Sequence, residues 1–165
     1  MPVEPRLHPA TPADLPVMQN LGRFYVYDMA RYCGDLPDWE CPDDGLWECI
    51  VFAPYFGAAG THPFMLRAAG VPAGFVVVRR LEEEGCWNME QFYVGAPHQR
   101  RGHGARLFRQ VLEQFPGAWR IEIIPENTRA LAFWRQVTAG AAPLVREAVE
   151  TPAQGAPRIV LRFET

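Results

Sequence analysis

The sequence predicts an α/β fold of the α+β type, in which a mixed and largely antiparallel sheet of about six to seven strands is flanked by helices. Short runs rich in β-branched and aromatic residues alternate along the chain with longer runs whose apolar residues recur at helical spacing. Strands and helices that alternate in this way pack as a sheet covered by helices. The chain has 165 residues, 48% of them hydrophobic and 21% charged, which suits one core better than two. We therefore expect residues 1–165 to form a single domain.

The first strand and the first helix are predicted close to the N-terminus. Residues 6–9 form the strand, and Thr11 can cap the helix that follows it. Pro12 suits the first helical position and Asp14 complements the helix dipole, and the helix is expected to end near Gly34. Apolar residues recur along it at helical spacing and predict one buried stripe: Leu15, Met18, Gly22, Tyr25 and Met29.

Residues 34–61 break the helical pattern with prolines, glycines and two tryptophans, Trp39 and Trp47. One interpretation is a solvated loop with one short helix. The other is an acidic and aromatic border of an acceptor site, where negative charge would attract an ammonium substrate. The segment contains no basic residue and six acidic ones: Asp35, Asp38, Glu40, Asp43, Asp44 and Glu48.

The remaining elements continue the alternation of strand-like and helical runs. Gly70 and Pro72 mark a turn between two antiparallel strands, and residues 82–85 form a charged turn before the fourth strand. We expect strands at residues 64–67, 73–79, 87–94, 119–124, 144–149 and 158–163, and helices at 105–115 and from residue 126 onwards.

A short glycine motif lies between the fourth strand and the next helix. Gly102 and Gly104 carry no Cβ, so a phosphate group can approach the backbone closely. The free N–H groups and the dipole of the helix start favour negative charge, and Arg100 and Arg101 add positive charge. The motif predicts a phosphate-binding loop, and a helix start with two chance glycines is the alternative. The motif is Gln99-Arg100-Arg101-Gly102-His103-Gly104.

The spacing of these residues resembles the acetyl-CoA loop of the GNAT N-acetyltransferase superfamily. The pattern is Val94-x4-Gln99-x2-Gly102-x-Gly104-x2-Leu107, with Asn127-x2-Ala130-x2-Phe133-Trp134 at the place of the family's next helix. The resemblance covers roughly residues 3–163 and implies a GNAT-like acyl-CoA N-acyltransferase fold. It implies transfer of an acetyl group from acetyl-CoA to a primary amine of a small molecule or peptide, by direct attack in a ternary complex.

Two residues depart from the family pattern. Ala96 stands where the family often has proline, and Trp134 stands where many members have a tyrosine that protonates the leaving thiolate. The missing tyrosine favours an alternative function, a non-catalytic acyl-CoA-binding or regulatory module on the same fold. Nucleotide binding is a weaker alternative, since the loop has no Walker lysine and no ribose-binding acid in a clear Rossmann setting.

The resemblance also implies how acetyl-CoA is held. The fourth and fifth strands separate, the pantetheine arm pairs with the backbone of residues 92–94, and a backbone N–H stabilises the oxyanion. The irregular residues 95–97 are expected to bulge and free those backbone groups. His98 and His103 are expected to be exposed or to contact phosphate. The implied cofactor contacts are Phe92, Tyr93, Val94, Gln99, Arg100, Arg101, Gly102, His103, Gly104, Ala105, Asn127, Phe133 and Trp134.

Glu90 is the candidate general base. It lies mid-strand in an apolar setting, and strand alternation places it on one face with Asn88 and Phe92. A half-buried carboxylate there can have a raised pKa and accept the amine proton through water. The alternative is a glutamate that faces solvent or makes an internal hydrogen bond. Tyr93 is expected on the opposite face, which makes it a poor candidate for the acid.

The other side chains of the predicted site have less defined roles. Trp134 cannot act as an acid, so core packing or a wall of the thiol channel is expected, and water can protonate the thiolate. Tyr25, Tyr27 and Asp28 on the first helix are candidates for the acceptor pocket. Core packing is the alternative for Tyr25, and exposure to solvent is the alternative for Tyr27 and Asp28.

The composition of the chain indicates which classes of partner and which cellular location to expect. A net charge of −3 argues against nucleic acid, and no apolar run approaches the ~20 residues that span a membrane. The N-terminus has no apolar signal core, so we expect a cytoplasmic protein. No metal is expected, and because family members are often dimers a homodimer is a candidate assembly. The cysteines lack the close spacing of a zinc site and are expected to be reduced structural thiols: Cys33, Cys41, Cys49 and Cys86.

Overall fold

The structure is a computed structural model of the chain and describes residues 4–37 and 39–165. Residues 1–3, which belong to the predicted domain, lie outside the described residues. So does Asp38, one of the six acids of the segment 34–61.

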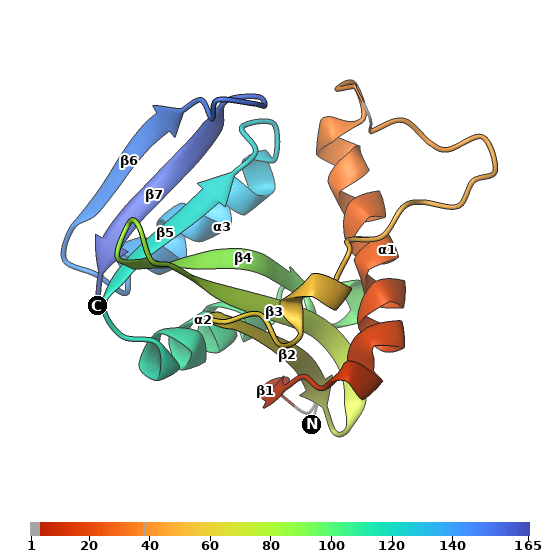
Figure 1. The fold of residues 1–165 in the computed structure, drawn as a ribbon, viewed down its shortest axis with the longest axis horizontal. Coiled ribbons are helices and arrows are strands. Elements are labelled where there is room, and N and C mark those ends of the chain that lie inside the picture. Colours follow the sequence, from red (N-terminus) through yellow and green to blue (C-terminus); the bar gives the residue numbers. More distant parts are fainter. Residues whose placement is uncertain (1–3, 38) are drawn as a thin grey trace.

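The described residues form a seven-stranded sheet in the order β1-β2-β3-β4-β5-β7-β6 (Figure 1). All neighbouring strands are antiparallel except β4 and β5, which run parallel. The predicted sheet is confirmed, and each predicted strand overlaps an observed one. The strands are β1 Arg6–Pro9, β2 Thr61–Ala68, β3 Val71–Leu81, β4 Cys86–Val94, β5 Ala118–Ile123, β6 Val145–Glu150 and β7 Arg158–Glu164.

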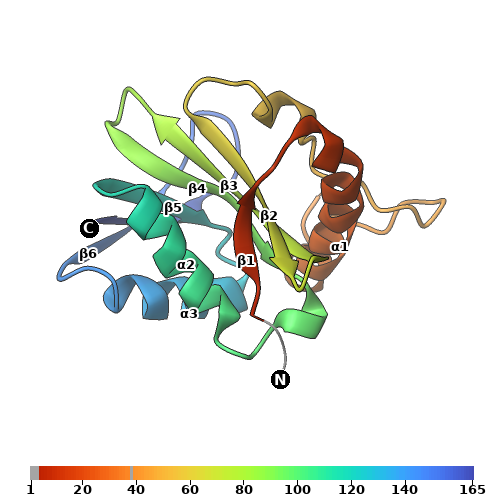
Figure 2. The same cartoon turned by 90° about the horizontal axis from the view of Figure 1, so that it is seen from below.

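In the described part of the chain, three α-helices cover the two faces of the sheet. Figure 2 shows α1 on one side of the strands and α2 and α3 on the other, and each side has its own apolar core. The predicted helix at 105–115 begins two residues earlier, at His103. No helix of the described segments combines the length and the apolar character needed to cross a membrane. The helices are α1 Leu15–Cys33, α2 His103–Gln114 and α3 Thr128–Ala139, with short 3-10 turns η1 Pro12–Asp14, η2 Ala53–Tyr55 and η3 Ala96–His98.

The start of α1 is fixed by side chains that the sequence indicates. The backbone N–H of Thr11 donates to Asp14 Oδ2 at 2.9 Å, and Pro12 begins the 3-10 turn that leads into the helix. Arg67 of β2 donates to Asp14 Oδ1 at 2.8 Å and so joins the helix start to the sheet. These contacts set the direction in which α1 crosses the strands.

A glycine on α1 lets the segment after the helix pack against it. Phe52 is fully buried on the α1 side of the sheet. A Cβ on Gly22 would lie 2.7 Å from Phe52 Cε2, closer than two carbons can approach. The absence of a side chain at Gly22 therefore makes room for the Phe52 ring, and the predicted stripe of α1 becomes one wall of a core.

The β4 strand carries a bulge that the sequence does not reveal. Val77 of β3 pairs with Gln91, whereas Val78 pairs with Met89, so Glu90 is the extra residue. The predicted bulge at residues 95–97 is wrong, because Gly95 is the N-cap of the 3-10 turn η3 and the next two residues lie in that turn.

The bulge changes which side chains share a face of β4. Phe92 packs into the core beneath α2 and α3, whereas Tyr93 packs into the core beneath α1. Glu90 reaches Arg79, which follows Val77 on the α1 side of β3. The expectation that Glu90 and Phe92 share a face is therefore wrong, and so is the expectation that Tyr93 lies opposite Glu90. One extra residue reverses a period of two from that point onwards.

The predicted separation of the fourth and fifth strands is confirmed. β4 pairs with β5 only at Trp87–Trp119 and Asn88–Arg120, although both strands continue beyond these residues. Figure 1 shows that β5 turns away from β4 beyond the paired residues, so the C-terminal end of β4 lies apart from β5. The rest of β4, as far as Val94, therefore has backbone groups without a partner strand on its β5 side.

Candidate active site

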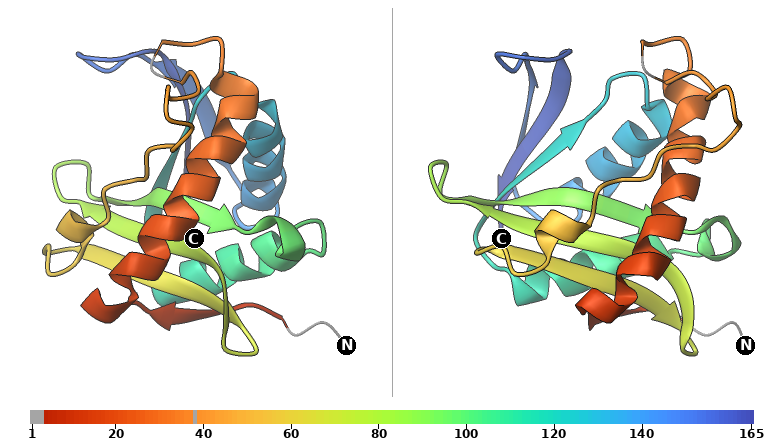
Figure 3. Two further views of the ribbon diagram at one scale, coloured as in Figure 1. Left: turned by 90° about the vertical axis from the view of Figure 1, so that its right-hand side faces the viewer. Right: turned by 45° about the vertical axis from the view of Figure 1, so that its right-hand side comes forward.

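A cleft of about 740 Å³ lies beside the separated end of β4. Its walls come from the C-terminal half of α1, the end of β4, the loop before α2 and the side of α3. Figure 3 shows α1 and α3 flanking the end of β4 in both views. Most of the predicted site residues line this cleft: Tyr25, Asp28, Phe92, Tyr93, Val94, Gln99, Arg100, Gly102, Gly104, Ala105, Asn127, Phe133 and Trp134.

Four predicted residues do not line the cleft, namely Glu90, Arg101, His103 and Tyr27. The Arg101 side chain is exposed, and its carbonyl accepts a hydrogen bond from Arg106. Tyr27 is 57% exposed and lies against Trp47.

His103 is 5% exposed, so the expectation that it is exposed is wrong. His103 is the first residue of α2, and its charged neighbours include Glu4, His98, Arg101 and Arg106. Burial lowers the pKa of the imidazole, and the nearby Arg106 acts in the same direction. Neither ring nitrogen has a hydrogen-bond partner among the described residues. His103 is therefore a neutral, enclosed side chain behind the loop.

Several residues of the cleft wall are not among those predicted from the sequence. Helical spacing from predicted residues is the signal that could have found most of them, since Tyr32 lies one turn beyond Asp28 and Val137 lies one turn beyond Phe133. The missed residues are Met29, Arg31, Tyr32, Ala96, Arg129, Ala130, Gln136 and Val137.

The loop end of the cleft has the geometry of an anion site. Gly102, the N-cap of α2, has a φ of 75°, and Arg100 has a φ of 59°. No side chain caps α2, so the amides of its first turn keep their hydrogen-bonding capacity. A Cβ on Gly104 would lie 3.1 Å from Phe133 Cε2, so this glycine also lets α2 approach α3.

Gln99 fastens this loop to two other walls of the cleft. Its Nε2 donates to the Val94 carbonyl at 2.7 Å, and its Oε1 accepts from Arg129 Nη2 at 2.7 Å. One side chain thus joins the end of β4, the loop and the first turn of α3. It also holds the Arg129 guanidinium near Arg100, so that positive charge gathers at this end.

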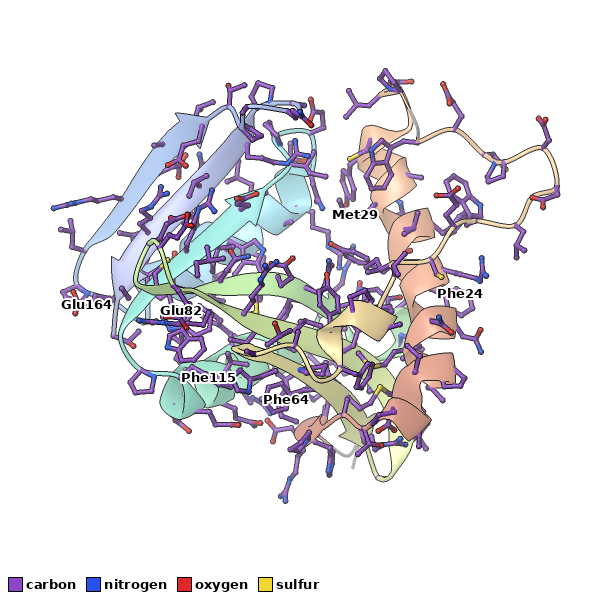
Figure 4. All side chains as sticks on the ribbon, in the orientation of Figure 1. Phe24, Met29, Phe64, Glu82, Phe115 and Glu164 are labelled. Carbon is purple, nitrogen blue, oxygen red and sulfur yellow. The ribbon has the colours of Figure 1, made fainter. Side chains whose placement is uncertain are left out.

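Asn127 joins α3 to α1. Its Oδ1 accepts the Ala130 N–H at 3.0 Å and caps α3, and its Nδ2 lies 2.9 Å from Met29 Sδ. Figure 4 shows Met29 on the side of α1 that faces β5 and α3, and Phe24 on the outer side. Asn127 therefore fixes the distance between two walls.

Trp134 is packed as the sequence led us to expect. It is 7% exposed and makes edge contacts with Phe92 and Phe108 at ring distances of 5.1 and 5.4 Å. It still lines part of the cleft. An indole N–H in such a place can form a wall but cannot protonate a thiolate.

The α1 end of the cleft is aromatic and carries one carboxylate. Tyr93 Oη donates to Asp28 Oδ2 at 3.3 Å. Burial raises the pKa of Tyr93, and the Asp28 carboxylate raises it further. Burial raises the pKa of Tyr25 to about 12. Both phenols are therefore protonated at neutral pH and can donate hydrogen bonds.

Glu90 lies at the bulge, outside the cleft lining. Its Oε2 accepts from Asn88 Nδ2 at 2.8 Å, and Arg79 Nη1 lies 3.9 Å from its Oε1. The internal hydrogen bond corresponds to the alternative interpretation of this residue. Its side chain is 23% exposed, so water can reach the carboxylate.

The acidic segment borders a different hollow. None of the described residues between 34 and 61 lines the cleft beside β4. Trp39, Glu40 and Trp47 instead line a separate hollow of about 550 Å³ with Tyr27 of α1. The short helix expected in this segment is the 3-10 turn η2. The described acids of the segment lie outside the cleft, and Glu40 lines the separate hollow.

The chain belongs to the acetyltransferase (GNAT) family. Residues 26–138 match the sequence profile of that family. The matched residues include the end of β4, the glycine loop and most of α3. No curated protein matches the chain at a significant level of similarity.

Solved structures of acetyltransferases share the fold. An acetyltransferase from Thermus thermophilus is 18% identical, with a TM-score of 0.70 over 100% of both chains. The ribosomal-protein-S18-alanine N-acetyltransferase from Escherichia coli is 15% identical, with a TM-score of 0.65 over 97% of this chain and 93% of that one. A candidate streptothricin acetyltransferase from Bacillus anthracis, in complex with acetyl coenzyme A, is 15% identical, with a TM-score of 0.52 over 72% and 70%. The fold therefore accommodates acetyl-CoA.

Proposed function

We propose that this chain transfers an acetyl group from acetyl-CoA to a primary amine of a small molecule or peptide, by direct attack within a ternary complex. The observation that carries the proposal is the cleft at the separated end of β4 and β5. Arginines and uncapped helix amides lie at its loop end, and a carboxylate lies at its α1 end. Membership of the GNAT family supports the same activity.

The proposed cofactor site uses backbone and charge. The first amides of α2, with Arg100 and Arg129, would hold the phosphate groups. The unpaired backbone of β4 near Phe92 to Val94 would pair with the amides of the pantetheine arm. Acetyl-CoA, when bound, supplies an activated acetyl group, and the enclosing walls orient the amine toward it.

The proton transfers that we propose use Glu90 and water, as the sequence suggests, although Glu90 lies outside the cleft lining. An alkyl ammonium must lose a proton before it attacks, and we propose that Glu90 accepts it through water, since its partly exposed carboxylate lies outside the cleft lining. Trp134 cannot serve as the acid, so we propose that water protonates the thiolate.

The free cysteines suit the reducing cytoplasm, which we propose as the location.

A second candidate function is a non-catalytic acyl-CoA-binding module. It is favoured by the buried Trp134 in the place where many family members carry a tyrosine. Steady release of free CoA in the presence of an amine would separate an enzyme from a binding module.

The test combines binding with turnover. Acetyl-CoA should raise the melting temperature of the chain, because a ligand that binds only the folded state stabilises it. A panel of primary amines with acetyl-CoA should release thiol continuously for at least one acceptor. An unchanged melting temperature with saturating acetyl-CoA and CoA would contradict the proposed cofactor site.

Gly104→Asp tests the loop, with Gly104→Ala as the matched control. Both variants add a Cβ beside Phe133, but only aspartate adds a negative charge near the proposed phosphate site. We expect Gly104→Asp to abolish the shift that acetyl-CoA produces, and Gly104→Ala to keep part of it. Equal loss in both variants would mean that packing, and not charge at the loop, decides binding.

A further inference from the structure

Asp28 is the only carboxylate among the described residues that line the cleft. The other charged residues of the lining are Arg31, Arg100 and Arg129. In the part of the chain that the structure describes, Asp28 forms no salt bridge with any of them. The cleft therefore contains a carboxylate whose charge no cation of residues 4–37 and 39–165 neutralises by direct contact.

Tyr93 holds this carboxylate in position. It is 7% exposed, and its ring packs against Tyr25 and Phe75 at centroid distances of 5.6 and 5.4 Å, so the phenol has little freedom to turn. Its hydroxyl donates to Asp28 Oδ2 at 3.3 Å. The phenol stays protonated at neutral pH, because burial and the neighbouring carboxylate both raise its pKa. The Tyr93 hydroxyl therefore keeps the proton that it donates to Asp28.

The other nearby acids are placed differently. Glu90 accepts a hydrogen bond from Asn88 and lies 3.9 Å from Arg79, outside the cleft lining. The described acids of the segment 34–61 also lie outside that lining. Asp28 is thus the acid that an amine within the cleft would meet.

We infer that Asp28, positioned by Tyr93, binds the ammonium group of the acceptor, and that the acceptor is a cationic primary amine with an apolar or aromatic body. This inference rests on the proposed function and names its acceptor class. The rings of Tyr25, Tyr32 and Tyr93 line the same end of the cleft and suit a cation and an apolar body. Arg100 and Arg129 come from the loop before α2 and from α3, whereas Arg31 lies on α1 with Asp28 and forms no salt bridge with it.

The experiment compares two probes of nearly equal shape. Phenethylamine carries an ammonium at neutral pH, and 2-phenylethanol carries a neutral hydroxyl in its place. Calorimetry measures their affinities for the chain at neutral pH, with and without CoA. We expect the wild type to prefer the amine by about 10-fold, the usual worth of a hydrogen bond to a charged group.

Three variants assign that preference to residues. Asp28→Asn should abolish the preference and leave the affinity for 2-phenylethanol unchanged. Tyr93→Phe removes the hydroxyl that orients the carboxylate and should reduce the preference without abolishing it. Asp43→Asn is the matched control, because it removes the same charge from an exposed position outside the cleft, and it should leave the preference within about 2-fold of the wild type.

Several outcomes would overturn the inference. The inference would be wrong if the preference for the amine survived in Asp28→Asn, or if Asp43→Asn reduced that preference as much as Asp28→Asn did. It would also be wrong if Asp28→Asn lost equal affinity for both probes. A wild type that binds neither probe, or binds both equally well, would contradict it too. The measurement involves no acetyl transfer. A chain that prefers the amine but releases no thiol with acetyl-CoA would contradict the proposed function and leave the ammonium site in place.

Discussion

Glu90 shows how much a single residue can depend on its neighbours along and across the sheet. As the extra residue of the β4 bulge it turns toward Arg79, and Asn88 donates to its carboxylate. Both contacts orient the carboxylate and leave it partly open to water. The place of Glu90 at the point where β4 leaves its pairing with β5 suits a proton relay through water, because the last paired residue of β4 is Asn88.

Glu90→Gln tests this role. If Glu90 takes the amine proton, the variant should lose about 10²- to 10⁴-fold in kcat/KM, the usual contribution of a general base. Its rate should recover as the pH rises toward the pKa of the amine, where free amine needs no base. Stabilisation by acetyl-CoA should persist. The measurements are a pH–rate profile and a melting curve with acetyl-CoA.

Glu83→Gln is the matched control, because Glu83 lies exposed in the turn before β4. It should leave kcat/KM unchanged. Near-wild-type turnover of Glu90→Gln at neutral pH would remove Glu90 from the mechanism. A variant that melts lower and also loses acetyl-CoA binding would instead mark Glu90 as structural.

At the scale of elements, the cleft exists because several elements are fastened to one another around a gap in the sheet. Gln99 joins the end of β4 to the loop and to α3, and Asn127 joins α3 to α1. The strands β4 and β5 share only two paired positions, although residues of both pack in one core. Gln99 and Asn127 therefore add links between the walls of the site beyond the paired part of the sheet.

Gln99→Ala should weaken acetyl-CoA binding without unfolding the chain. The change frees the Val94 carbonyl and the Arg129 guanidinium, each held by a bond of 2.7 Å. We expect the Kd of acetyl-CoA to rise roughly 5-fold, which corresponds to about 1 kcal/mol, the net worth of one hydrogen bond. Gln114→Ala, at the exposed end of α2, is the control and should leave the Kd unchanged. An unchanged Kd in Gln99→Ala would show that the loop keeps its shape without this side chain.

At the scale of the whole molecule, ion pairs link elements that are distant in the sequence, and they make stability depend on pH. The backbone N–H of Thr11 and the Arg67 guanidinium hold the pKa of Asp14 below its ordinary value of 3.8. Hydrogen bonds from Arg135 and Arg162 hold the pKa values of Glu147 and Glu150 below their ordinary value of 4.5. A carboxyl whose pKa is lower in the folded state stabilises the fold above its unfolded pKa. That stabilisation is lost as the pH falls through the folded pKa.

The melting temperature should therefore decrease when the pH is lowered below about 4, because these three carboxylates then take up protons. Asp14→Asn keeps an oxygen that can accept the Thr11 N–H but removes the negative charge beside Arg67. It should lower the melting temperature by about 2 °C at neutral pH, because a partly exposed ion pair contributes roughly 0.5 to 1 kcal/mol in a domain of this size. The difference from the wild type should shrink as the pH falls below about 4. Asp35→Asn, an exposed residue just beyond α1, is the control. A difference that stays constant down to the acid transition would exclude the Asp14 charge as its cause.

The sequence by itself determined the elements and the family of this chain. The apolar stripe of α1, the β-branched runs of the strands and the glycine loop before α2 are local patterns. Local patterns fix local structure, because backbone preference and side-chain periodicity act over a few residues. Residues 99–104 could be identified as a glycine loop at the start of a helix for the same reason, since a helix start and its glycines lie together in the sequence.

Only the tertiary structure decided which side chains meet at the site. The bulge at Glu90 follows from the pairing of β4 with β3, and it reversed the predicted faces of Phe92 and Tyr93. Tyr27 and Asp28 are adjacent in the sequence, yet a turn of about 100° per residue sends one to the outer hollow and the other into the cleft. Asp28 and Tyr93 lie 65 positions apart and meet only because α1 crosses β4. Contacts of this kind depend on register and packing direction between elements, and no pattern within one element encodes them.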